Sequence, residues 1–194
     1  MSLLSILSGD IQGEAISGIG GQLGLNEQQT QAAVSAAMPL LIKAMSQNAS
    51  GGGADALLGA LQKDHDGSIL DDVPGFMAGG NAAAGAGILK HVLGGKQDVV
   101  ASGIARAAGL DSGQSAQVLA MLAPVVLGAL GKTRSENDFG ADDIIGLLNQ
   151  ETQTLESNNP DVMGVLGNLL DTDNDGDIAD DLVNIGGKLL SGML

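Results

Sequence analysis

The chain has no cysteine and almost no aromatic residues, and each shortage excludes part of what it could be. Without cysteine, disulfides, thiolate nucleophiles and cysteine-ligated zinc sites are excluded. Phe76 and Phe139 are the only aromatic residues, although 44% of the 194 residues are hydrophobic. Sheets normally draw on β-branched and aromatic side chains, whereas the Ala, Leu and Gly that are abundant here let helices approach closely. The composition therefore predicts an all-α fold.

Basic residues are also scarce, with 8 Lys and Arg against 23 Asp and Glu and a formal net charge of −15. A charge of this sign and size repels phosphate backbones and anionic membrane surfaces. We therefore expect no nucleic-acid partner.

No apolar stretch reaches the length of a typical membrane span. The longest, residues 118–131, is shorter than the roughly 20 residues that a bilayer requires, and it contains Pro124. It predicts a buried helix rather than an anchor. The first residues have no basic segment, and Asp10 and Glu14 interrupt their apolar pattern. We therefore predict no signal peptide and a cytoplasmic protein.

The usual catalytic signatures are missing from the sequence. No Ser stands in a Gly-x-Ser-x-Gly elbow, and neither a His-Glu-x-x-His motif nor a P-loop is present. Gly18, Gly20 and Gly21 follow a helical pattern rather than a strand, so they do not predict a dinucleotide site. His65 is expected to be solvated in a charged turn, and His91 to be a surface or packing residue. We predict no catalytic residue, no cofactor-binding residue and no enzyme.

The sequence does contain one pattern that occurs twice. Residues 3–45 align with residues 88–130 without a gap. In both copies a Gly closes one helix and a start signal opens the next. We therefore predict two tandem related modules, residues 1–78 and 84–194, packed as one multi-helical bundle.

Each start signal is a capping box that opens a strongly apolar helix. The capping pairs are Asn26 with Gln29 and Asp111 with Gln114. The predicted helices, residues 27–45 and 112–130, are the expected centres of the modules. Pro39 and Pro124 occupy equivalent interior positions, where loss of a backbone hydrogen bond predicts a kink or a break.

Shorter helices are expected after these two. Residues 54–61 predict a short helix after a flexible Gly-rich stretch, and a similar sequence recurs at residues 140–148. Residues 77–87 join the copies and predict a flexible start that passes into a helix by Ala84. A further helix is expected after the start signal at Asn159.

Both copies end in an acidic turn, residues 64–72 and 173–181. In the second, the front of an EF-hand calcium loop runs from Asp171, with carboxylates at its odd positions and Gly176 at the sixth. Leu182 stands where the closing Glu is expected, so calcium affinity would be weak, on the order of 10⁻⁴ to 10⁻³ M. The predicted ligands are Asp171, Asp173, Asp175, Asp177 and Asp181, with Asp180 as the alternative to Asp181.

The acidic residues also fit a turn without metal, in which carboxylates bond their own backbone and Asp177 caps a following helix. In the first copy, Gln62 stands at the first loop position in place of Asp, and His65 replaces the Asn of the second copy. The structural turn is therefore favoured over a metal loop in that copy.

Several motifs in this order resemble the bacterial YidB-like family, a domain of unknown function. They are Gly-Gly-Lys-Gln-Asp at 94–98, Ser-Gly-Ile-Ala at 102–105, Ala-Gly-Leu-Asp at 108–111, Ala-Pro-Val-Val-Leu-Gly-Ala-Leu at 123–130, and the two acidic turns. The resemblance implies an all-α fold and a bacterial origin, and it implies no activity or catalytic residue. We predict a non-enzymatic structural or interaction protein that binds an unidentified protein or associates with itself. The alternative is a weak calcium-binding module acting through residues 171–181.

Overall fold

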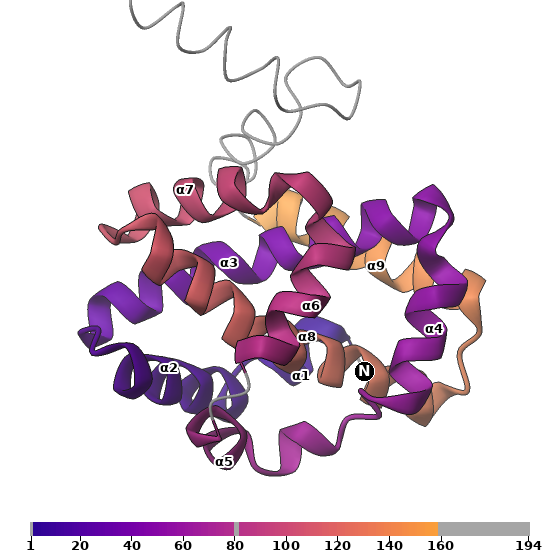
Figure 1. Cartoon of the computed structure of the whole chain (residues 1–194). Helices are drawn as coiled ribbons and strands as arrows, with labels where there is room; N and C mark the ends of the chain where they lie inside the picture. The colour runs from indigo at the N-terminus through magenta and orange to yellow at the C-terminus, as the bar shows by residue number, and fades with distance from the viewer. Residues whose placement is uncertain (1, 80–81, 159–194) are drawn as a thin grey trace, which may run out of the picture.

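The computed structural model describes residues 2–79 and 82–158, and in these ranges it contains helices and turns but no strand (Figure 1). The all-α prediction is therefore confirmed. The α-helices in chain order are α1 (Leu3–Leu7), α2 (Asp10–Leu23), α3 (Glu27–Asn48), α4 (Ala54–Lys63), α5 (Val73–Ala78), α6 (Ala82–Leu93), α7 (Gln97–Ala108), α8 (Ser112–Asn137) and α9 (Ala141–Asn158). A π-helical turn at Ala49–Gly53 joins α3 to α4, and 3-10 turns occupy Ser68–Asp71 and Gly94–Lys96.

The predicted calcium ligands lie outside the described residues, as does the helix expected after Asn159. The ligands concerned are Asp171, Asp173, Asp175, Asp177 and Asp181.

Both predicted capping boxes are present. At the start of α3, the Asn26 carboxamide oxygen accepts from the Gln29 backbone N–H at 2.9 Å, and the Gln29 side chain accepts from the Asn26 N–H at 3.4 Å. At the start of α8, Asp111 and Gln114 make the same pair of bonds at 2.8 and 3.2 Å. Each box satisfies backbone donors that the first turn of a helix leaves unpaired.

The residues around these boxes repeat as well. Gly24 and Gly109 end α2 and α7, each in the left-handed region at φ 65°, which costs a glycine little. Thr30 and Ser115 are fully buried, and each hydroxyl donates to the carbonyl oxygen of the capping residue four positions earlier, at 2.9 and 3.0 Å. The same local set of hydrogen bonds therefore occurs at the start of both α3 and α8.

The prolines do not break the central helices, so that part of the prediction is wrong. The helix α3 continues through Pro39 to Asn48, and α8 continues through Pro124 to Asn137, beyond the ends expected from sequence. Both prolines are buried. Tertiary packing along a buried helix outweighs the single backbone bond that a proline removes.

The apolar side chains gather into one core around α8. Residues 118–131 of α8 are all buried, and α3, α6 and α7 pack against this helix (Figure 1). The core cluster draws on both predicted modules, and its buried members include no aromatic side chain. The division into two modules stays a prediction.

Among the described helices, α8 is the one that is long and apolar enough to cross a membrane. However, 78% of its most apolar 18-residue window is buried inside the protein. Core helices of soluble proteins share this length and composition, so the feature is weak evidence for a span.

Two glycines of α8 let the first acidic turn lie directly on the helix. A Cβ placed on Gly131 would collide with the carbonyl oxygen of His65, and one placed on Gly128 would collide with the side chain of Ile69. Since a backbone carbonyl cannot swing aside as a side chain can, Gly131 determines how closely this turn approaches α8.

We predict that Gly131→Ala destabilises the protein by about 1–3 kcal/mol, because overpacking forces the turn away from α8. The matched control is Gly146→Ala on α9, where a Cβ would meet no atom within 4 Å. That variant should gain about 0.5–1 kcal/mol, because Ala favours a helix interior over Gly. Urea unfolding followed by circular dichroism measures both free energies. Equal stability of the two variants would contradict the close approach of the turn.

Candidate functional site

A pocket of about 490 Å³ lies among α4, α6, α8 and the π-helical turn, and it is called here the histidine pocket. Its apolar wall consists of Ala56, Leu57, Ala60, Ile88, Val92 and Leu127. Gly53, Ala84 and Gly87 add backbone and small side chains, and the polar side chains are those of Asn48, His65 and His91.

His65 enters the pocket from the acidic turn that follows α4. The expectation that this side chain is solvated is wrong, because the residue is half-buried. The turn rests on α8 at Gly131, which brings His65 down onto the helix surface. Burial lowers the pKa of His65 by disfavouring the charged imidazolium, and the nearby Asp64 carboxylate opposes this effect.

His91 lies on α6 and is exposed, as expected of a surface residue. Its Nδ1 is 2.9 Å from the carbonyl oxygen of Gly87, one helical turn earlier. A carbonyl oxygen only accepts hydrogen bonds, so Nδ1 carries the proton, and Nε2 of the neutral ring is left as an acceptor. The Asn48 side chain donates to the His91 carbonyl oxygen at 3.0 Å, which ties the end of α3 to α6.

The histidine pocket has the general form of a small-molecule site. Such sites commonly measure about 300–1,000 Å³ and combine apolar walls with a few polar groups that orient the ligand. Here the walls are aliphatic, and two imidazoles and one carboxamide supply the polar atoms. In the part of the chain that the structure describes, neither imidazole is hydrogen-bonded to a side-chain hydroxyl or carboxylate.

Two carboxylates of the first acidic turn accept hydrogen bonds from backbone N–H groups. The Asp66 carboxylate accepts from the backbone N–H of Ser68 at 3.0 Å. Hydrogen bonding from the backbone and side chain of Ser68 lowers the pKa of Asp66. Asp72 accepts from the N–H of Gly75 at 2.9 Å and caps α5. Within residues 2–79 and 82–158, no three His, Asp or Glu side chains come together as a metal site.

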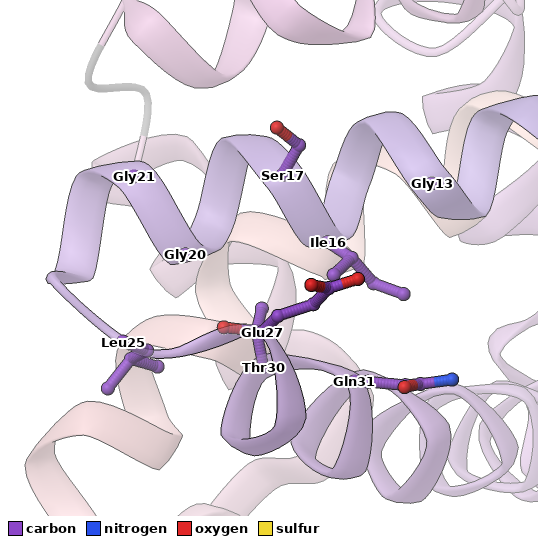
Figure 2. A pocket seen from close by; sticks show the side chains of 9 residues that line it. All are labelled: Gly13, Ile16, Ser17, Gly20, Gly21, Leu25, Glu27, Thr30 and Gln31. Atoms are coloured by element: carbon purple, nitrogen blue, oxygen red, sulfur yellow. The ribbon is translucent and has the colours of Figure 1, made fainter.

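A second cleft, of about 500 Å³, runs between α2 and the start of α3 (Figure 2). Gly13, Ser17 and Gly21 follow one another along its α2 side, and Glu27 and Gln31 line it from α3. No basic side chain lines this cleft, so it does not suit a phosphate group.

The glycines of α2 are helical, as their sequence pattern predicted. Gly18 packs against Met77 of α5, and Gly20 packs against the Thr30 side chain. Their role is therefore close helix packing, and the phosphate-binding turn of a dinucleotide site is absent at these positions.

Both histidines were considered from the sequence, but their position in one pocket was not predicted. They are distant in the chain, and they meet in one pocket only because α4 and α6 both pack against α8. Asn48 was missed as a pocket residue altogether. The one local signal for the pocket in the sequence was the spacing of Gly87 and His91, which places both on the same face of a helix.

We predict that stability falls between about pH 7.5 and pH 5.5 more steeply in the native protein than in His65→Gln. The native-state pKa of His65 is below its ordinary value of 6.5, so the unfolded chain takes up a proton that the folded chain resists. The stability that depends on a neutral His65 is fully present above the pKa of this side chain in the unfolded chain. It is lost as pH falls below that value toward the native-state pKa. Melting temperatures across this range measure the difference, and parallel pH profiles would contradict it.

Comparison with known proteins places the chain in a family without giving it an activity. No curated protein and no solved structure matches it. A family model described as a bacterial protein of unknown function, DUF937, matches residues 5–133. This range runs from α1 into α8 and includes every residue that lines the histidine pocket. The expectation of a YidB-like relationship agrees with this match. The chain belongs to DUF937, a family of bacterial proteins whose function is unknown.

Proposed function

We propose that this protein is a non-enzymatic interaction protein that binds a small apolar molecule in the histidine pocket. The observation that carries the proposal is the pocket itself, a space of about 490 Å³ with aliphatic walls and few polar groups. An apolar molecule of matching size gains free energy by leaving water for such walls.

The arrangement of polar groups supports binding rather than catalysis. A histidine that acts as a catalytic base is normally hydrogen-bonded to a nucleophile or oriented by a carboxylate. Nδ1 of His91 is bonded instead to the backbone carbonyl of Gly87. The amide nitrogen of Asn48 is bonded to the backbone of His91. The first bond lies within α6, and the second connects the end of α3 to α6 beside the pocket.

The paired capping boxes also support two related modules, residues 1–78 and 84–194. Matching bonds at Asn26 and Asp111, and matching left-handed glycines before them, are what two copies of one module would contain. The acidic charge supports a partner other than nucleic acid, and the burial of α8 supports a protein without a membrane span. A cytoplasmic location belongs to the same proposal.

We predict that N-phenyl-1-naphthylamine, an uncharged dye that brightens in apolar sites, binds with a dissociation constant on the order of 0.1 mM. The chain has no Trp or Tyr, so dye fluorescence is read without background from them. Gly87→Leu should weaken binding about tenfold, because a Leu on this face of α6 fills the pocket.

The matched control for this test is Gly146→Leu. Like Gly87, Gly146 is an exposed glycine inside a helix, with no atom within 4 Å of an added Cβ, but it lies on α9 away from the pocket. Its dye affinity should equal that of the native protein. Absence of dye binding, or equal loss of binding in both variants, would rule out the histidine pocket as the site.

A second candidate function is weak calcium binding through residues 171–181, and the sequence pattern Asp-x-Asp-x-Asp-Gly from Asp171 is what favours it. We predict that calorimetry with millimolar calcium gives a dissociation constant on the order of 10⁻⁴ to 10⁻³ M. Asp173→Ala should abolish the heat by removing one ligand. Asp142→Ala, an exposed carboxylate of α9, is the control and should leave the heat unchanged. No heat from the native protein would remove this candidate.

A further inference from the structure

The class of ligand follows from the polar atoms of the histidine pocket, provided that the pocket is the binding site proposed above, on which this step rests. Leu57 and Leu127 are buried, whereas His91 and Gly87 are exposed. The leucines therefore lie at the base of the pocket and the His91 imidazole at its opening. A bound molecule would have its apolar body against the leucines and any polar group near His91.

The imidazole of His91 presents an acceptor to that polar group. Its Nδ1 proton is already committed to the carbonyl oxygen of Gly87 at 2.9 Å. The neutral ring has only one N–H, so Nε2 has a lone pair and no proton. A ligand group that meets Nε2 must therefore donate a hydrogen bond.

The other polar side chains of the pocket offer few donors. The Asn48 amide nitrogen already donates one of its two N–H groups to the His91 carbonyl oxygen, and the Asn48 carboxamide oxygen lies beside Gly53. The His65 ring, when neutral, offers one donor and one acceptor. Burial lowers the pKa of His65, which favours this neutral form.

These polar atoms discriminate among ligand groups. A carboxylate would bring a negative charge to a site with two free side-chain donors, the second N–H of Asn48 and one N–H of His65, in a protein whose net charge is −15. An ammonium group needs several acceptors and loses its hydration. A hydroxyl carries no charge and both donates and accepts hydrogen bonds. It therefore matches a pocket with an open acceptor on His91, one donor and one acceptor on His65, and one free N–H on Asn48.

We infer that the histidine pocket takes an uncharged apolar molecule with a single hydroxyl group, an alcohol or a phenol, whose O–H donates to Nε2 of His91. The aliphatic wall binds the carbon skeleton, and the hydroxyl selects among molecules of the same size.

Three probes with the same ring system test this inference: naphthalene, 2-naphthol and 2-naphthoate. Equilibrium dialysis near neutral pH measures the affinity of each for the native full-length protein. We expect 2-naphthol to bind about 3–10 times more tightly than naphthalene, the effect of one neutral hydrogen bond. We expect 2-naphthoate to bind at least about tenfold more weakly than 2-naphthol.

His91→Phe keeps an aromatic ring at the opening and removes the acceptor. It should remove the preference for 2-naphthol over naphthalene, so that the ratio of the two affinities falls to about one. Gly87→Leu should weaken all three probes, and Gly146→Leu none of them.

Outcomes that overturn the inference differ from those that overturn the proposed function. Binding of 2-naphthoate as tight as that of 2-naphthol, equal binding of 2-naphthol and naphthalene, or a hydroxyl preference that survives His91→Phe would each overturn the inference. Failure of all three probes while N-phenyl-1-naphthylamine still binds would overturn it too. Absence of dye binding, or dye binding that Gly87→Leu does not weaken, would instead overturn the proposed function.

Discussion

The structure depends on the burial of one stretch of α8. Residues 118–131 have no exposed member, so every side of the helix must be covered by something that fits closely. Close fit is possible because the side chains are small: Gly128 and Gly131 admit the acidic turn, and Gly85 of α6 meets the carbonyl oxygen of Ala120. Phe76 and Phe139 pack only against the edge of the core, and short distances between backbones therefore contribute to its close packing.

The same composition explains why a pocket exists. Around it, Ala56, Ala60 and Ala84 stand where larger side chains would fill the space, and Gly87 has none. The rigid core beneath, with Leu57 and Leu127, prevents the walls from collapsing inward. A fold that packs tightly around α8 but has small residues at its edge produces an apolar pocket, and Asn48, His65 and His91 supply its polar side chains.

Charge is organised in a way that net charge alone does not reveal. The Asp66 carboxylate accepts from the backbone of the first acidic turn, and the Asp72 carboxylate caps α5 by accepting from Gly75. Glu151 of α9 is only 4% exposed, and its carboxylate accepts from the backbone N–H of Leu3 at 2.7 Å. That hydrogen bond connects α1 to α9. A buried carboxylate requires a hydrogen-bond donor, and the first turn of a helix has backbone N–H groups without a partner in the helix.

The amino-acid sequence by itself determined the helical class, the capping boxes at Asn26 and Asp111, and the turn formed by the first acidic segment. Each of these depends on residues within a few positions of one another, where capping and turn chemistry act. Tertiary structure decided the rest: α8 continues through Pro124, and His65 is half-buried and lines the same pocket as His91. These outcomes depend on contacts between distant segments, whose free energy outweighs local preferences and leaves no periodic signal in the sequence.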